Sequence, residues 1–278
     1  MSTNYEPPTT DIRLGLSSYT YGWAVGLLGH APACPLDESG LLHKCHEHGV
    51  KLLQIGDNLP LHTFDAARLD RLAQRARKEG VRLEVGARRL TLERIGDYAA
   101  IARRVGASLI RFEIDDADYH PEPASVTAVL HKAVPLLDGL TLGIENHDRF
   151  PAATLRSIID AAGSDRIGVC LDTANSLGAG EGLDTVLATL GPLTVNLHIK
   201  DFHIARVRHL MGFTVEGRQA GQGFLDVPLL LKQLAAFPRC QTAVLELWTP
   251  PEPLLEETIA KEAAWAAQSL AFLKPLFR

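Results

Sequence analysis

The chain has 278 residues, of which 46% are hydrophobic, and a formal net charge of −5. This length suits a single α/β barrel, which takes about 250 residues. No basic stretch is long enough to follow a phosphate backbone, and no apolar run approaches the roughly 20 residues of a membrane span, so we expect neither nucleic-acid nor membrane partners.

The N-terminal residues 1–11 have neither the basic region nor the apolar core of a signal peptide. We predict that they form a disordered lead. The four cysteines are scattered along the chain without a CxxC pair, which is typical of reduced thiols. Together these features predict a cytoplasmic protein.

Strands and helices are predicted to alternate from residue 12 onward. Short apolar runs predict strands at 12–19, 50–56, 81–87, 108–114, 140–145, 167–172, 193–199 and 242–247. Amphipathic patterns predict helices at 37–48, 65–79, 92–105, 122–137, 151–162, 181–190, 226–236 and 253–273. Residues 201–225 are predicted to be an extended polar loop. Eight strand-and-helix units predict one (β/α)8 TIM barrel over residues 12–278, with a doubly wound open sheet as the alternative.

Four polar residues close successive predicted strands in the second half of the chain. In a parallel barrel, such strand ends meet at one mouth, where active sites are built. Three carboxylates and one imidazole there are costly unless a cation compensates them, so we predict a divalent-metal site. A buried salt-bridge network is the structural alternative. The four residues are Glu145, Asp172, His198 and Glu246.

Further polar side chains are expected at the same mouth because residues two apart on a strand share a face. Gln54 and Tyr19, from the first two strands, are expected at its rim. Three pairs point into the mouth on this ground: Glu145 with His147, His198 with Lys200, and Arg111 with Glu113.

The motifs GIENH, CLDTAN, LHIKDF and VLELW resemble those of the xylose isomerase-like TIM-barrel superfamily. This superfamily contains ketose 3-epimerases, hydroxypyruvate isomerases, inosose and dehydroshikimate dehydratases, and endonuclease IV nucleases. The resemblance implies one divalent metal and no organic cofactor. Mn²⁺ is the expected ion, with Mg²⁺, Co²⁺ and Zn²⁺ as alternatives. The implied ligands are Glu145, Asp172, His198 and Glu246.

The resemblance also implies a reaction. We expect a sugar isomerase or epimerase that works through a metal-bound enediolate on a small polyhydroxylated ketose or keto sugar acid. In the ketose epimerases, the carboxylates that match Glu145 and Glu246 move the protons. In the dehydratase branch the position of His147 does so, and Lys200 is a candidate for orienting or protonating a substrate oxygen. A homodimer or homotetramer is a further expectation.

The chain departs from the ketose 3-epimerase pattern at two positions. Asn175 and Ile204 stand where those enzymes have a substrate-binding His and an Arg. Arg111 matches a position that binds a substrate carboxylate in the dehydratase branch, so an acidic sugar is a candidate substrate. The predicted substrate-binding residues are Gln54, Arg111, Asn175, His203, Arg206 and Arg208.

Three alternatives to an isomerase stay open. The first is a lyase on the same scaffold, a decarboxylase or dehydratase of a 3-oxo sugar acid, which the arginines favour. The second is an abasic-site nuclease, which the acidic balance disfavours. The third is a non-catalytic accessory barrel.

Overall fold

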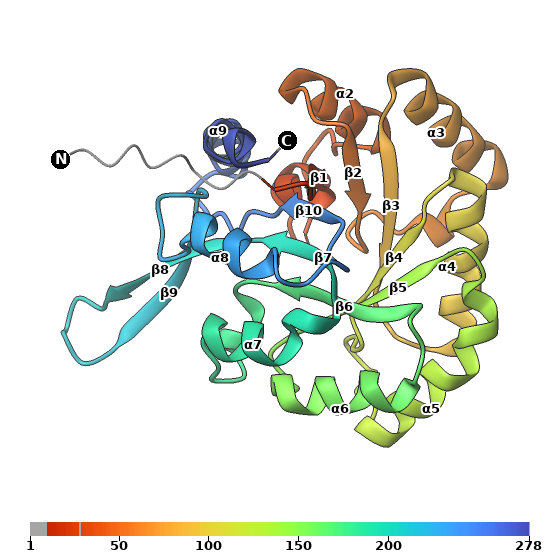
Figure 1. The fold of residues 1–278 in the computed structure, drawn as a ribbon. Coiled ribbons are helices and arrows are strands. Elements are labelled where there is room, and N and C mark those ends of the chain that lie inside the picture. Colours follow the sequence, from red (N-terminus) through yellow and green to blue (C-terminus); the bar gives the residue numbers. More distant parts are fainter. Residues whose placement is uncertain (1–9, 28, 278) are drawn as a thin grey trace.

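The computed structural model describes residues 10–27 and 29–277. Eight parallel strands close into a barrel in the order β1-β10-β7-β6-β5-β4-β3-β2, which confirms the predicted TIM barrel (Figure 1). The strands are β1 (Arg13–Ser17), β2 (Leu52–Ile55), β3 (Arg82–Ala87), β4 (Leu109–Phe112), β5 (Thr141–Glu145), β6 (Ile167–Asp172), β7 (Thr194–Ile199) and β10 (Thr242–Leu245).

Helices surround the barrel (Figure 1). They are α1 (Gly22–Val25), α2 (Glu38–His48), α3 (Ala66–Glu79), α4 (Leu92–Val105), α5 (Pro123–Ala133), α6 (Ala152–Ala162), α7 (Leu183–Leu190), α8 (Val227–Leu234) and α9 (Leu255–Leu273). Short 3-10 turns are Ser18–Tyr21, Leu61–Thr63, Val134–Leu137, Asn175–Leu177, Gly191–Leu193 and Lys274–Leu276. The helix predicted at 122–137 changes to a 3-10 turn at Val134, because Pro135 has no N–H to continue the α-helical hydrogen bonds.

Local sequence signals set the ends of these helices. Side-chain oxygens accept hydrogen bonds from the first-turn N–H groups of four helices, at Asp37, Asp65, Thr91 and Asp226. Three of these helices, and α6 as well, end at a glycine in the left-handed conformation, a geometry that costs glycine little: Gly49, Gly80, Gly106 and Gly163. Each of these glycine caps turns the chain back toward the barrel, where the next strand begins.

The loop prediction for residues 201–225 was wrong for two segments, which form strands. Asp201–Arg206 (β8) and Phe213–Arg218 (β9) form an antiparallel two-stranded ribbon that projects from the barrel (Figure 1). The buried carboxylate of Asp201 accepts hydrogen bonds from the backbone N–H groups of Gly221, Gly223 and Leu225 at 2.9–3.0 Å. A side chain at Gly223 would collide with that carboxylate, so glycine is required for this close approach.

At the N-terminus, residues 1–9 of the predicted lead lie outside the described residues. The Thr10 N–H donates to the Leu276 carbonyl at 3.2 Å, which ties the start of the described chain to its end. Within the described residues, no helix combines the length and apolarity needed to cross a membrane.

Candidate metal centre and substrate cavity

The four predicted metal ligands meet at the C-terminal mouth of the barrel. Glu145 and Asp172 are the last residues of β5 and β6, His198 is the penultimate residue of β7, and Glu246 directly follows β10. The His198 Nδ1 atom lies 3.2 Å from Glu246 Oε1, 3.8 Å from Glu145 Oε1 and 3.9 Å from Asp172 Oδ2. All four side chains are buried.

A hydrogen bond from the barrel interior, on the side away from the mouth, orients the imidazole of His198. Its Nε2 lies 2.7 Å from Gln54 Oε1, an atom that only accepts hydrogen bonds, so Nε2 carries the proton. Nδ1 therefore presents its lone pair to three carboxylates and has no hydrogen-bond partner among the described residues. Negative oxygens around a lone pair repel one another unless a cation lies between them. Three carboxylates and one imidazole thus fit a divalent cation of the oxygen-preferring class.

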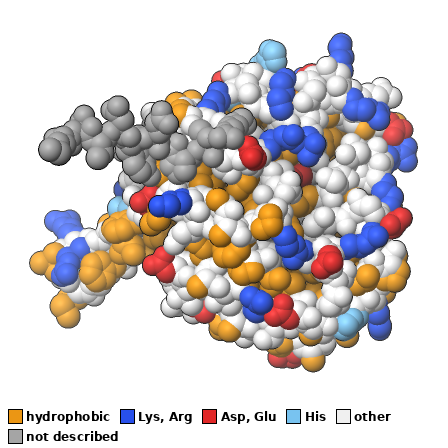
Figure 2. All heavy atoms as spheres, viewed as in Figure 1, with side chains coloured by type: hydrophobic (Ala, Val, Ile, Leu, Met, Phe, Trp, Pro, Cys, Tyr) orange, Lys and Arg blue, Asp and Glu red, His pale blue; other side chains and the backbone are white. Residues whose placement is uncertain are grey.

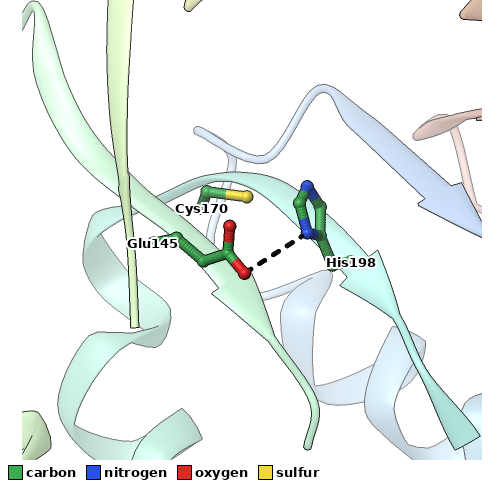
Figure 3. Close-up of side chains that lie close together, drawn as sticks. All are labelled: Glu145, Cys170 and His198. Carbon is green, nitrogen blue, oxygen red and sulfur yellow. Dashed lines mark ion pairs between the residues drawn. The ribbon is translucent and has the colours of Figure 1, made fainter. Parts of the chain in front are cut away.

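Cys170 adds a sulfur to this group. Figure 3 shows its Sγ between the side chains of Glu145 and His198, all three pointing toward one another from neighbouring strands. The Cys170 thiol lies 3.0 Å from Asn196 Oδ1, and burial raises its pKa well above the ordinary thiol value. A protonated thiol is a weak ligand, so the carboxylates and His198 remain the stronger donors.

Two cations lie against the ligand carboxylates. The Lys200 Nζ atom is 2.9 Å from Asp172 Oδ2 and 3.1 Å from Glu246 Oε2. Arg111 Nε pairs with Glu145 Oε2, and Arg111 Nη1 is 2.6 Å from Asp57 Oδ1. The buried salt-bridge network that we considered as the alternative to a metal site is therefore partly formed. Asp57 also pairs with Arg88 at 2.9 Å. The three carboxylates of Glu145, Asp172 and Glu246 still outnumber Lys200 and Arg111, which leaves negative charge for a metal ion to neutralise.

Burial and these charges shift the pKa values of the site. Burial opposes ionisation of Glu246, but the charges of Lys200 and Arg111, together with that of His198 whenever its imidazole is protonated, outweigh it and hold the pKa of Glu246 below its ordinary value. Burial alone would lower the pKa of Lys200, yet the carboxylates of Asp172 and Glu246 raise it above the ordinary value. Lys200 is therefore an ammonium at neutral pH, and its raised pKa makes it a proton donor only toward a strongly basic atom.

A cavity of about 850 Å³ opens above the ligands, and Glu246 and Lys200 lie in its wall. Much of the remaining wall is apolar, with Trp23, Leu177 and Trp248 among its side chains. The cavity is large enough to enclose a small sugar acid. A second cavity on the side of β4 and β5, lined mainly by charged side chains, shares His147 and Asp148 with the first.

A family model described as xylose isomerase-like TIM barrel matches residues 42–276. The chain belongs to this family. A curated relative, 3-oxo-isoapionate decarboxylase of Pectobacterium atrosepticum, is 31% identical over 262 residues, which are 94% of each chain.

Solved structures agree with the fold. D-psicose 3-epimerase from Clostridium cellulolyticum, solved with D-tagatose, has a TM-score of 0.71 at 14% identity over 96% of this chain and all of that one. A xylose isomerase-like TIM-barrel protein from Mycobacterium smegmatis in complex with magnesium has a TM-score of 0.68 at 14% identity, covering 99% of this chain and 100% of that one. At these identities, the likeness establishes the fold of the family.

The predicted substrate contact Asn175 and the predicted catalytic residue His147 both lie at the cavity. The Asn175 Nδ2 group donates to Glu145 Oε1 at 2.7 Å, and its Oδ1 lies 3.3 Å from Lys200 Nζ. His147 lies at the rim, 2.7 Å from Asp148 Oδ1 and 3.8 Å from Glu113 Oε1. Burial would lower the pKa of His147, but the carboxylates of Glu113 and Asp148 raise it. Both side chains can therefore contact a ligand in the cavity.

The other predicted contacts lie elsewhere. Gln54 is 1% exposed and lies beneath His198, not at the rim, and its amide donates to Glu84 and Asn196 at 3.0 and 3.1 Å. Arg111 is 4% exposed and its guanidinium contacts protein carboxylates. The structure therefore gives both side chains protein partners within the barrel.

The loop residues His203, Arg206 and Arg208 belong to the projecting ribbon or its tip. His203 Nε2 contacts Arg218 at 2.9 Å, Arg206 donates to the Leu210 carbonyl at 3.1 Å, and Arg208 is exposed. The ribbon residues in the cavity wall are instead Val215, Glu216 and Gly217. The structure does not bring the predicted basic residues to the metal ligands.

Sequence reasoning missed several residues of the site. Asp57 comes two residues after β2 and joins Arg111 to Tyr19, whose hydroxyl donates to Asp57 Oδ2 at 2.8 Å. Cys170 lies two residues before Asp172, so strand parity would have placed it on the inner face. Glu262 reaches the cavity from α9 and has no such local signal.

Proposed function

We propose that this protein is a divalent-metal-dependent lyase that removes the carboxylate of a 3-oxo sugar acid as CO₂. The observation that carries the proposal is the 31% identity, over 94% of both chains, to an enzyme named 3-oxo-isoapionate decarboxylase. The site supports the same reaction class because it combines a candidate metal centre with a protonated lysine in the cavity wall.

In this reaction the bond between C1 and C2 of the acid breaks and CO₂ leaves. The electron pair moves toward the C3 carbonyl, and C2 then takes up one proton, so that the product is a ketone shorter by one carbon. Glu145, Asp172, His198 and Glu246 would hold the ion. A bound divalent ion, for which we propose Mn²⁺ or Mg²⁺, polarises a carbonyl oxygen and stabilises the negative charge that develops on it.

The contacts of the two glutamates favour a lyase. Decarboxylation needs an electron sink and a proton donor, but no base that removes a proton from carbon. Glu145 accepts from Arg111 and Asn175, and Glu246 accepts from Ser17 at 2.9 Å beside the Lys200 ammonium. Carboxylates engaged in this way are weak bases, whereas Lys200 is placed to give up a proton.

The apolar part of the cavity favours the loss of CO₂. A carboxylate held near Trp23 and Trp248 loses hydration that neutral CO₂ does not need. This difference in hydration lowers the activation free energy for C–C cleavage of the bound acid. Asn175, Lys200 and His147 supply the polar contacts that orient the hydroxyl and carbonyl groups.

An isomerase or epimerase is the second candidate. Glu145 and Glu246 stand on strands separated by β6 and β7, so they approach His198 from two sides. Two carboxylates on either side of a substrate are what a two-base proton transfer requires. The two candidates differ in their product, since only the lyase shortens the carbon chain.

The test uses chelator-stripped protein reloaded with Mn²⁺ or Mg²⁺ and a panel of 3-oxo sugar acids and ketoses. We expect trapped CO₂ in equal amount to the substrate consumed, and we expect Lys200→Met to lose this activity. Lys44→Met is the matched control, because Lys44 pairs with Glu47 on the surface of α2. Isomer exchange of a ketose without CO₂ would support the second candidate instead.

A further inference from the structure

A layer of polar side chains lies inside the barrel, on the side of His198 away from the mouth. Figure 2 shows Lys, Arg, Asp and Glu side chains spread over the outer surface of the molecule. Glu84, on β3, is instead 2% exposed, and Asn196, on β7, is fully buried. Branched apolar side chains usually fill the interior of such a barrel, and buried polar groups are costly unless they are hydrogen-bonded. Polar residues at this depth therefore indicate a role beyond packing.

The carboxamide of Gln54 could present either of its two ends to His198. Its oxygen only accepts hydrogen bonds, whereas its NH2 group only donates them. An oxygen opposite His198 Nε2 requires a proton on that nitrogen and leaves Nδ1 free to bind an ion. An NH2 group there would require an unprotonated Nε2, and the proton would move to Nδ1, which faces the three ligand carboxylates. The residues that orient Gln54 therefore decide which imidazole nitrogen can bind a metal.

Asn196 orients Gln54 through a chain of hydrogen bonds that starts at the backbone. The Asn196 Nδ2 atom lies 3.3 Å from the Thr242 carbonyl oxygen and 2.8 Å from Thr242 Oγ1. Because a carbonyl oxygen only accepts, this end of Asn196 is the NH2 group. The other end, Oδ1, accepts from Gln54 Nε2 at 3.1 Å and from the Cys170 thiol at 3.0 Å. Gln54 thus turns its NH2 group toward Asn196 and its oxygen toward His198.

Glu84 supports the same orientation of Gln54 from a second side. Its Oε2 atom accepts from Gln54 Nε2 at 3.0 Å and lies 3.4 Å from Asn196 Nδ2. An NH2 group has two hydrogens, so Gln54 donates one to Asn196 and the other to Glu84. Burial raises the pKa of Glu84, but a neutral carboxyl group keeps a carbonyl oxygen that accepts from Gln54. The reversed carboxamide would place its oxygen against two acceptors, which opposes that orientation.

We propose that Asn196 and Glu84 are positioning residues of the metal centre, which fix the carboxamide of Gln54 and thereby keep a proton on His198 Nε2. The inference rests on the metal site of the proposed function, but not on the reaction that this site performs. It also gives Cys170 a role in the network, since its thiol donates to the Asn196 oxygen that orients Gln54.

The first test is the imidazole NMR spectrum of ¹⁵N-labelled, metal-free protein, in which the His198 signals are assigned by their loss in His198→Gln. We expect the wild type to carry a proton on Nε2 that exchanges slowly with solvent. In Asn196→Leu and in Glu84→Leu, part of the Gln54 population can reverse its carboxamide. The Nε2–H signal should then weaken, and a signal of unprotonated Nε2 should appear. Glu84→Gln keeps an acceptor for Gln54 and should keep the wild-type spectrum.

The second test is a double-mutant cycle on the Mn²⁺ affinity of chelator-stripped protein, measured by calorimetric titration. Glu84→Leu should weaken Mn²⁺ binding by about 10-fold in the wild-type background, as expected for an outer contact of a metal ligand. In the Gln54→Leu background the same change should alter the affinity by less than about 2-fold, because Glu84 acts through Gln54. A general loss of folding would weaken binding equally in both backgrounds.

Thr194→Val is the matched control, because Thr194 is also buried on β7 but its hydroxyl donates to the Leu190 carbonyl, at 3.1 Å. Melting temperatures show whether each variant is folded. An Nε2 proton and a Mn²⁺ affinity that stay at their wild-type values in folded Asn196→Leu and Glu84→Leu would overturn the inference. Spectra that change as expected in a protein that releases no CO₂ would contradict the lyase and still support the roles of Asn196 and Glu84.

Discussion

Replacement of Gln54 by leucine tests how the barrel prepares His198 for a metal ion. The Gln54 side chain makes three buried hydrogen bonds, at 2.7 Å to His198, 3.0 Å to Glu84 and 3.1 Å to Asn196. Leucine has similar volume but removes the acceptor that keeps the proton on Nε2. The imidazole can then adopt the other tautomer, in which the proton is on Nδ1, the atom that faces the carboxylates.

We expect Gln54→Leu to weaken metal binding by about 10- to 100-fold, the usual effect of removing such a supporting contact. This corresponds to about 1.4–2.8 kcal/mol of binding free energy. The free energy of unfolding should also fall by about 1–3 kcal/mol, because Glu84 and Asn196 each lose a buried partner. Gln54→Glu keeps an acceptor opposite His198 and should keep most of the metal affinity.

The assay is calorimetric titration of chelator-stripped protein with Mn²⁺, with circular dichroism as the check on folding. Gln268→Leu is the matched control, since the Gln268 side chain contacts Gln219 at 2.8 Å on the surface. Wild-type Mn²⁺ affinity in a folded Gln54→Leu variant would refute the role of Gln54 in positioning His198.

Four further predictions concern the site. Glu145→Gln and Glu246→Gln should each abolish turnover and weaken metal binding, and a variant with bound metal and near-normal kcat would contradict the ligand assignment. Lys200→Met should lower kcat by about 10²- to 10⁴-fold, as expected for loss of a proton donor, and should tighten Mn²⁺ binding because the ammonium no longer competes for Asp172 and Glu246. Removal of the metal by a chelator should lower the melting temperature, and return of Mn²⁺ should restore it. Burial raises the pKa of Glu262 from 4.5 to about 7, so its protonated form favours the folded state and the free energy of unfolding should fall as pH rises from about 4.5 to about 7. Denaturant titrations across this range should show that fall in the wild type and a smaller one in Glu262→Gln.

The barrel and the meeting of the four ligands were predictable because both depend on local periodicity. Apolar runs and glycine caps place each strand, and the face of a side chain follows from its position along the strand. Glu145, Asp172 and His198 needed no knowledge of distant contacts. That they bind a metal stays a prediction, which the orientation of His198 supports.

Other features depend on contacts between distant segments. Residues 201–218 mix polar and apolar side chains, and the ribbon exists because β8 and β9 pair with each other and Asp201 closes its base. Arg111 carries the charge expected for a substrate carboxylate, but Asp57 and Glu145 occupy its guanidinium. The alternation of side chains along a strand indicates that Gln54 points inward. It does not indicate how far below the mouth Gln54 lies, which depends on the stagger of β2 against β7 in the closed barrel.

The most direct test of the proposed reaction is NMR of a 3-oxo sugar acid, labelled with ¹³C at C1, incubated with Mg²⁺-loaded protein in D₂O. The lyase predicts that the label leaves as CO₂ and that the shortened ketone carries deuterium at the former C2. Both changes should require the metal and Lys200. Deuterium exchange or epimerisation with the label retained in the sugar would contradict the lyase and identify an isomerase.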